Sequence, residues 1–247
     1  MKKRRSRGVS NTKRTTLFST GGDLKISVKK FIYEGFSDYH KIEIIDTKKF
    51  GRCLFVDDVI QLSEYDHLIY DQELLKKLTQ KDQIILIIGG GDGFVARTAI
   101  NSYDSIKKIV VVDIDKQIVR LSDKYFHVID KEFKHKVEYV IDDIFSFLSY
   151  CNVSCFDYII CDLTDDPVKE DKNTLEEFYL NLLTKLKKGA KKKTWISIQA
   201  GTPTVYKGVD SFKIIKKLAN THLREVSFAT KKIPSFGEDA SFVFGRY

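Results

Sequence analysis

The stretch that decides the fold is Ile84-Ile85-Leu86-Ile87-Ile88-Gly89-Gly90-Gly91-Asp92-Gly93. Its apolar residues predict a buried strand, and the glycines after them predict a tight turn. Residues 94–100 then fit the start of a helix. A strand, a glycine-rich turn and a helix in this order are typical of the first unit of a nucleotide-binding α/β domain.

One carboxylate, Asp92, lies inside this turn. Turns of this kind that bind phosphate use free backbone N–H groups, and a carboxylate beside them would repel the anion. The dinucleotide fingerprint G-x-G-x-x-G fails when counted from Gly89, and counted from Gly91 it fits only its alanine variant. We therefore expect a cationic ligand, such as a sulfonium or an amine, and regard NAD as disfavoured.

Beyond the turn, strand and helix patterns alternate. Strands are predicted at 84–88, 108–113, 137–141, 156–162 and 194–199, and helices near 93–102, 115–126, 144–149, 173–187 and 209–222. This alternation predicts an α/β fold, with a parallel sheet that is covered on both faces. Two closing strands, at 226–230 and 240–246, are expected to run antiparallel.

Upstream of residue 83 the pattern is different. Short alternating strands at 24–32, 39–46 and 51–56 predict a small antiparallel layer with a hairpin turn at 48–51, and 64–78 has a helical period. The expected organisation is a basic flexible arm at 1–22, an N-terminal β domain at 23–76 and a doubly wound α/β domain at 77–247.

The charge is unevenly distributed. The net charge is +8, but seven basic residues precede the first acid, Asp23, so the remainder carries 8 − 7 = +1. That arm lacks the apolar core of a secretory signal. We expect a solvated flexible end, with an organellar presequence or a nucleic-acid-binding tail as alternatives.

The apolar runs and the cysteines narrow the class of protein. The apolar runs are too short to span a membrane. The four cysteines include no C-x-x-C pair, which favours reduced thiols in a cytoplasmic protein and gives no zinc motif.

Carboxylates follow each of the first four strands of the predicted parallel sheet, at the edge where such sheets bind ligands. They are Asp92, Asp113, the pair Asp142 and Asp143, and Asp162. An acid at a strand end often caps the next helix, but capping alone accounts poorly for all four ends. Acids this close repel one another unless a cation offsets them. Asp113 follows Gly91 by 113 − 91 = 22 residues, a spacing that suits an acceptor for ribose hydroxyls in NAD and S-adenosyl binders alike.

With these motifs in view, the chain resembles the polyamine aminopropyltransferases, the spermidine and spermine synthases, from about residue 39 to residue 244. Residues 54–66 (LFVDDVIQLSEYD) are similar to the family's L-x-L-D-G-x-x-Q-x-x-E-x-D, and residues 89–93 match its G-G-G-D-G. Its Y-[HQ]-E, D-S-S-D-P and I-P-T-Y motifs have counterparts at 70–73, 162–167 and 233–236. The resemblance implies a small antiparallel β domain plus a Rossmann-like sheet of the S-adenosylmethionine methyltransferase type.

The resemblance also implies a reaction. An amine attacks the methylene beside the sulfonium of decarboxylated S-adenosylmethionine, the aminopropyl group moves, and methylthioadenosine leaves. A carboxylate beside the amine can accept its proton; Asp162 is the expected base, with Tyr70 and either Asp165 or Asp166 orienting the amine. We expect no metal and no prosthetic group, because the sulfonium leaves as a neutral thioether.

Further roles follow from the same resemblance. Asp92 would hold the donor's aminopropyl ammonium, Asp113 the ribose hydroxyls, and Asp143 would lie near the adenine amino group. The other expected donor-binding residues are Gln61, His40, Gly89, Gly90, Gly91, Ile114 and Ile144; the expected acceptor-binding residues are Asp71, Asp92, Asp162, Asp166, Phe236 and Glu238.

Some positions depart from the family's pattern. His40 replaces a glutamine and Phe236 a tyrosine, and one extra residue in the D-S-S-D-P region makes Asp165 and Asp166 compete for the second acid. The loop reads D-L-T and then P, and Glu238 follows P-S-F, as in the spermine-synthase branch. Extra acids suit a longer acceptor, which favours spermidine over putrescine and gives spermine or thermospermine as the product.

Two other functions stay open. An S-adenosylmethionine-dependent amine methyltransferase would use the same sheet, although Asp92 disfavours a donor carboxylate. A catalytically degenerate relative would bind polyamines, or nucleic acid through its arm, without turnover. The acidic crevice would repel phosphates, so no nucleic acid is expected in the active site. The remaining expectations are a small-molecule polyamine as ligand, no membrane partner and, from the family, a homodimer or homotetramer.

Overall fold

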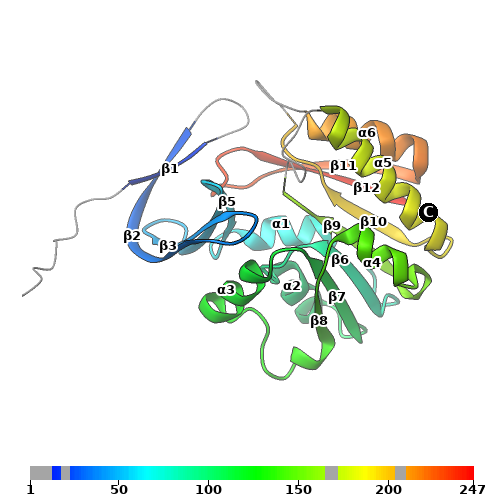
Figure 1. The fold of residues 1–247 in the computed structure, drawn as a ribbon, viewed down its shortest axis with the longest axis horizontal. Coiled ribbons are helices and arrows are strands. Elements are labelled where there is room, and N and C mark those ends of the chain that lie inside the picture. Colours follow the sequence, from blue (N-terminus) through cyan, green and yellow to red (C-terminus); the bar gives the residue numbers. More distant parts are fainter. Residues whose placement is uncertain (1–12, 18–22, 165–171, 204–209) are drawn as a thin grey trace, which may run out of the picture.

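The computed structural model describes residues 13–17, 23–164, 172–203 and 210–247, which form two sheets with helices packed on them (Figure 1). The smaller sheet is antiparallel, with the strand order β1-β2-β3-β4-β5. Its strands are β1 Lys13–Leu17, β2 Asp23–Phe36, β3 Lys41–Thr47, β4 Arg52–Val56 and β5 Val59–Ser63. The predicted small antiparallel layer is therefore confirmed.

The first strand corrects the prediction that residues 1–22 form a flexible arm. Residues 13–17 pair antiparallel with the beginning of β2, from Lys13 opposite Ser27 to Leu17 opposite Asp23. The β-branched Thr15 and Thr16 favour an extended backbone. β2 also offers them an edge whose backbone groups would otherwise be unpaired. The prediction was wrong for this part of the arm because it rested on charge and took no account of strand pairing.

Two tight turns shape the small sheet. The predicted hairpin at 48–51 is present: the N–H of Thr47 donates to the carbonyl of Gly51 at 2.8 Å, and Gly51 has φ 69°. Between β4 and β5, Asp57 and Asp58 have φ values of 48° and 69°. Two consecutive left-handed residues in a two-residue loop are the mark of a type I′ hairpin turn.

The larger sheet has the strand order β11-β12-β10-β9-β6-β7-β8. Five of its strands are parallel: β6 Ile84–Gly89, β7 Lys108–Asp113, β8 Val137–Ile141, β9 Tyr158–Asp162 and β10 Trp195–Gln199. Two antiparallel strands close the sheet, β11 Arg224–Lys232 and β12 Asp239–Arg246. Because β6 lies between β7 and β9, the order of the strands reverses there. Such a reversal opens a crevice at the carboxyl ends of the strands.

Helices cover both faces of this sheet, as the sequence predicts. They are α1 His67–Leu74, α2 Phe94–Ser102, α3 Lys116–Phe126, α4 Ile144–Tyr150, α5 Lys172–Gly189 and α6 Ser211–His222, with 3-10 turns at Lys134–Lys136 and Val153–Cys155. Alternate residues of β6 face opposite ways: Ile85 and Ile87 join the core under α1, α2 and α3, whereas Leu86 and Ile88 join the core under α4, α5 and α6.

The small sheet is docked on the first of these cores. Its Ile42, Ile44 and Leu54 are buried in the same cluster as Ile85 and Ile87 of β6. In Figure 1 the small sheet, blue to cyan, lies beside α1 and α3. This packing brings the residue before β3, the end of β4 and strand β5 over the crevice of the larger sheet. Among the described helices, none has the length and apolar character needed to cross a membrane.

Candidate active site

A cavity of about 610 Å³ opens at the carboxyl ends of β6, β7 and β9, between the larger sheet and the small sheet. Its walls carry eleven carboxylates and, among the described residues, neither Lys nor Arg; the acids are Asp57, Asp66, Asp71, Asp92, Asp113, Asp115, Asp142, Asp143, Asp162, Glu238 and Asp239. Low-dielectric walls with one sign of charge concentrate ions of the opposite sign. The cavity is therefore built for a cationic ligand.

The glycine turn after β6 forms the floor of this cavity. Gly89 has a φ of 76°, a backbone conformation that residues with a side chain rarely adopt. A Cβ on Gly91 would lie 2.4 Å from Oδ2 of Asp113, and the N–H of Gly91 instead donates to that oxygen at 2.9 Å. Bare backbone at these positions lets the end of β7 and any ligand approach the turn closely.

Asp113 is held in place from two sides. Its Oδ2 accepts from Gly91, and its Oδ1 accepts from the N–H of Asp115 at 2.7 Å. Burial raises the pKa of Asp113 above its ordinary value, although these two hydrogen bonds oppose the rise. A fixed carboxylate of this kind can accept hydroxyl hydrogen bonds without first reorganising.

Asp162, the predicted base, meets Tyr70 across the cavity. The hydroxyl of Tyr70 donates to Oδ1 of Asp162 at 2.5 Å. The Tyr70 ring is held by edge-on contacts with Phe242 and Phe236, at centroid distances of 5.3 and 6.0 Å. Burial, and after it the charge of Asp92, raises the pKa of Asp162 well above the usual aspartate range. A carboxyl group with a raised pKa is a better proton acceptor for an amine.

Asp92 lies where α2 begins. Its Oδ1 accepts from the N–H of Phe94 at 2.8 Å. Burial raises the pKa of Asp92, the hydrogen bond from Phe94 opposes this, and the nearby charges of Asp71 and Asp113 add to the rise. A cation that binds among such acids offsets their mutual repulsion and favours their charged forms.

Asp71 belongs to a chain of polar residues that the sequence did not indicate. Its Oδ2 accepts from the hydroxyl of Thr98 at 2.6 Å and pairs with Nδ1 of His67 at 2.8 Å. Nη2 of Arg97 lies 3.1 Å from Nε2 of His67. A guanidinium only donates, so Nε2 accepts, and we assign the imidazole proton to Nδ1, which makes His67 neutral. The four-residue spacing of His67 and Asp71 on α1 was the one sequence signal for this contact.

The small sheet provides one wall of the cavity. Nδ1 of His40 lies 2.8 Å from Oδ2 of Asp57, and Oδ1 of Asp57 accepts from the N–H of Lys41 at 2.9 Å. His40 and Gln61 both line the cavity. The sheet thus brings two of the predicted donor-binding residues to the ends of β6 and β7.

The loop between β11 and β12 provides another part of the wall, with Phe236 and Glu238. Its position depends on Asp66, which lies just before α1 and is 2% exposed. Asp66 accepts from both the N–H and the hydroxyl of Ser235, at 2.7 and 2.8 Å. Asp66 ends the motif at residues 54–66, but the sequence indicates no role for it, because its partner lies 169 residues away.

The structure brings the predicted site residues that it describes to this one cavity, including Ile114, Asp143 and Ile144. Asp143 also caps α4 by accepting from Phe145 and Ser146, and Asp115 caps α3. Asp165 and Asp166 lie outside the described residues, so the identity of the second acid stays a prediction. In the ranges that the structure describes, no cluster of His, Cys, Asp or Glu could hold a metal ion.

Comparisons with known proteins agree with this geometry. A family model described as Spermine/spermidine synthase domain matches residues 62–244, and another, described as Spermidine synthase tetramerisation domain, matches residues 15–64. The chain is 34% identical over 165 residues to a protein of Hydrogenobaculum sp. (strain Y04AAS1) named Polyamine aminopropyltransferase; the match covers 65% of this chain and 58% of that protein.

Two further proteins are similar over more of the chain. The Spermidine synthase of Schizosaccharomyces pombe is 30% identical over 222 residues, 87% of this chain and 71% of that protein. The crystal structure of spermidine synthase from Thermotoga maritima superposes with a TM-score of 0.81 at 20% identity, over 99% of this chain and 82% of that one. This last likeness confirms the predicted fold: a small antiparallel sheet joined to a larger, mostly parallel sheet.

Proposed function

Because the chain belongs to the spermine and spermidine synthase family, we propose that it is a polyamine aminopropyltransferase with decarboxylated S-adenosylmethionine as the donor. The observation that carries this proposal is the cavity lined by eleven carboxylates around the hydrogen-bonded pair Asp162 and Tyr70. Both substrates are cations. A site with no Lys or Arg among its described residues attracts them and needs no metal for a sulfonium leaving group.

The donor fits the part of the cavity formed by β6, β7 and the small sheet. Asp113 accepts from the ribose hydroxyls, and Asp143 and Ile144 lie against the adenine. Asp92 binds the ammonium of the aminopropyl group. The remaining donor contacts that we propose come from Gly89, Gly90, Gly91, Ile114, Gln61 and His40, all of which line the cavity.

The reaction is a displacement at carbon. The lone pair of a neutral amine attacks the methylene next to the sulfonium, and the new N–C bond forms as the C–S bond breaks. The electron pair of the broken bond stays on sulfur, which leaves as the thioether of methylthioadenosine. The amine proton passes to Asp162, whose raised pKa suits it to this role, while Tyr70 fixes the carboxylate.

The acceptor is spermidine in our proposal, giving spermine or thermospermine. Glu238 and Asp239 add carboxylates at the β11–β12 loop, and Asp71, Asp162 and Phe236 line the same space. A third ammonium, which putrescine lacks, has partners there. Asp166, or Asp165 in its place, completes the expected acceptor site.

The test measures methylthioadenosine formed from decarboxylated S-adenosylmethionine with putrescine, agmatine, spermidine or norspermidine, and separates spermine from thermospermine. Turnover with spermidine is expected. Asp162→Asn should lower kcat about a hundredfold or more, the usual contribution of a general base, while donor binding measured by calorimetry persists. Methyl transfer from S-adenosylmethionine, in place of aminopropyl transfer, would move the chain to the methyltransferases. Binding of both substrates without turnover would make it a degenerate relative.

We also propose that the chain forms a homodimer or homotetramer. The match of residues 15–64 to a tetramerisation domain supports an oligomer but not its size. Light scattering of the purified protein distinguishes the two. A cytoplasmic location stays a prediction, to be checked by fractionation.

A further inference from the structure

Helix α3 is held by the small sheet at its first turn. Asp115 caps the helix: its Oδ1 accepts from the N–H of Gln117 at 2.8 Å. Its other oxygen, Oδ2, accepts from the hydroxyl of Ser37, between β2 and β3, at 2.5 Å. Asp115 is 3% exposed, so this contact is shielded from water. It lies two residues beyond Asp113, in the wall of the cavity.

The same sheet also holds the other end of α3. The helix ends at Phe126, and His127 follows with a left-handed φ of 50°. The last carbonyls of a helix have no partner within the helix. Here Nη1 of Arg52, on β4, donates to the carbonyl of Tyr125 at 2.6 Å. A positive group at this end also suits the helix dipole.

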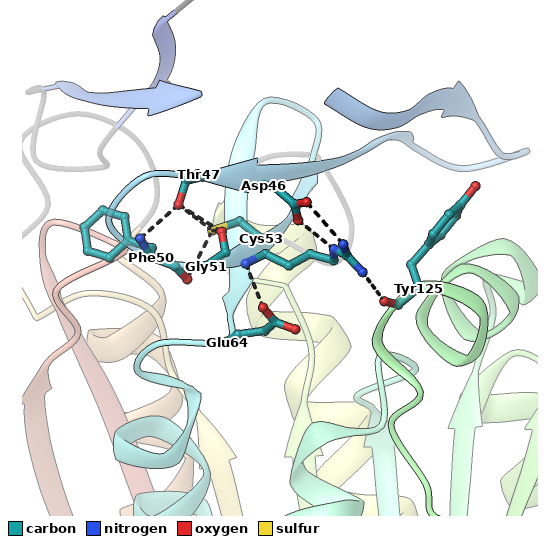
Figure 2. Close-up of polar contacts among 8 residues, drawn as sticks. Asp46, Thr47, Phe50, Gly51, Cys53, Glu64 and Tyr125 are labelled. Carbon is teal, nitrogen blue, oxygen red and sulfur yellow. Dashed lines mark hydrogen bonds and ion pairs between the residues drawn. The ribbon is translucent and has the colours of Figure 1, made fainter. Parts of the chain in front are cut away.

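The guanidinium of Arg52 bridges two elements. Its Nε and Nη2 donate to the two oxygens of Asp46 on β3, at 2.7 and 3.2 Å, while Nη1 reaches α3. Figure 2 marks these hydrogen bonds, to the carboxylate of Asp46 and to the carbonyl of Tyr125, with dashed lines. The backbone N–H of Arg52 is fixed in turn by Oε2 of Glu64 at 2.9 Å.

Only arginine can make this bridge. Its planar fork offers several donors in fixed directions, whereas lysine has one ammonium that cannot satisfy a bidentate carboxylate and a distant carbonyl together. The rings of Tyr33, on β2, and Tyr125 lie 6.2 Å apart beside it. The two contacts, at Asp115 and Tyr125, stand at opposite ends of an 11-residue helix, about 15 Å apart at 1.5 Å per residue.

We propose that Arg52 is a positioning residue for the donor site: through Tyr125 it holds the small sheet on α3, so that His40 and Gln61 keep their distance from Asp113. Two attachments at the ends of α3 prevent the sheet from tilting about one of them. Arg52 itself does not line the cavity. This inference rests on the proposed function for its choice of ligand.

The experiment compares Arg52→Lys with Arg246→Lys, a matched control. Arg246 donates to both oxygens of Glu225, at 2.7 and 2.8 Å, and lies on β12 outside the cavity. For Arg52→Lys we expect the KM for decarboxylated S-adenosylmethionine to rise about tenfold, the equivalent of one lost charge-assisted hydrogen bond, with kcat within about twofold. The Kd for methylthioadenosine, measured by calorimetry, should rise alike. Arg246→Lys should change none of these values.

A second variant and a second measurement distinguish an effect on the donor site from a loss of folding or of turnover. Ser37→Ala, at the other end of α3, should raise the same Kd. Amide exchange in the last turn of α3 should speed up in Arg52→Lys. If Arg52→Lys lowered the unfolding temperature but left KM and Kd unchanged, Arg52 would be merely structural. If it left amide exchange in α3 unchanged, the proposed attachment of the small sheet to α3 through Arg52 would be overturned, whatever the ligand. A wild-type protein that binds methylthioadenosine without turnover would contradict the proposed function but leave the Kd test in force.

Discussion

At Asp162, burial and the hydrogen bond from Tyr70 act on the carboxyl pKa in opposite directions, and burial prevails. The folded-state pKa therefore lies above the unfolded value of about 3.9. A group with a raised folded pKa contributes stability that is fully present below the unfolded pKa and is lost as the pH rises through the folded pKa. The ligand-free protein thus keeps Asp162 charged at a cost in stability.

Asp162→Asn retains an acceptor for Tyr70 but removes the charge, so the ligand-free variant should unfold a few degrees above wild type at pH 8. Each pKa unit corresponds to about 1.4 kcal/mol and each kcal/mol to about 2–4 °C in a chain of this size. The difference should shrink toward pH 5. Thermal unfolding at pH 5, 6, 7 and 8 measures it.

Asp157→Asn is the control of opposite sign. Burial raises the pKa of Asp157, but the hydrogen bonds from Lys191 and from the N–H groups of Gln83 and Ile84 outweigh it, so the pKa is lowered. A lowered folded pKa contributes stability above the unfolded pKa that is lost as the pH falls. The variant should therefore unfold below wild type at pH 8. If both variants shifted in the same direction at every pH, burial would not be the cause.

The grouping of the candidate site residues was predictable where the sheet topology fixes it. Asp92, Asp113 and Asp162 follow apolar strands, and parallel strands end at one edge, so the sequence brings them together without knowledge of packing. The contacts of Asp66 with Ser235 and of Asp71 with Thr98 were not predictable, because they form only through tertiary packing.

At the scale of elements, the turn between β4 and β5 is under backbone strain. A type I′ turn strongly favours glycine at its second central position, and this chain has Asp58 with φ 69°. A residue with a Cβ in the left-handed region costs about 1–2 kcal/mol relative to a right-handed conformation. The ion pair of Asp58 with Lys41 is exposed and contributes little against this.

Asp58→Gly should therefore stabilise the protein by about 0.5–1 kcal/mol, measured as the free energy of unfolding in urea. The control is Asp58→Ala, which removes the same ion pair but keeps the Cβ and should be neutral or destabilising. Equal effects of the two substitutions would show that the ion pair, rather than the backbone, decides the outcome.

The same turn explains an element that the sequence did not predict. Strand β5, Val59–Ser63, follows directly on Asp57 and Asp58. The strongest short signal for a hairpin is Asn-Gly or Asp-Gly, and with aspartate in the glycine position that signal is missing. The strands at 108–113 and 137–141, by contrast, have the bounds that their apolar patterns predict. The helix predicted at 64–78 is shorter, His67–Leu74, because Leu75 and Leu78 reach the core from turns.

At the scale of the whole molecule, the charges are separated. The chain carries a net charge of +8, yet the cavity has eleven carboxylates and, among the described residues, neither Lys nor Arg. The sequence indicated this concentration at the strand ends. The contribution of the β11–β12 loop was predictable only from the family resemblance, because no pattern in the neighbouring sequence indicates that Glu238 lies in the cavity wall.

Under the proposed function, Glu238 separates long acceptors from short ones. Glu238→Gln should raise the KM for spermidine about three- to tenfold, as expected for one weakened charge-assisted contact, and leave the KM for putrescine within about twofold. Steady-state kinetics with each amine gives both values. Glu225→Gln, at an exposed acid outside the cavity, should alter neither. A parallel loss with both amines would place Glu238 on the donor side.

Under the proposed function, the acid-lined cavity also bears on how the catalytic cycle ends. Each transfer lengthens the amine by one ammonium, while the departing thioether is neutral, so the polyamine product carries more charge than the acceptor it came from. A cavity that attracts cations then holds its product more tightly than its substrate. The electrostatic attraction that speeds substrate binding at low ionic strength would also make product dissociation the slow step. Added salt would weaken this product inhibition.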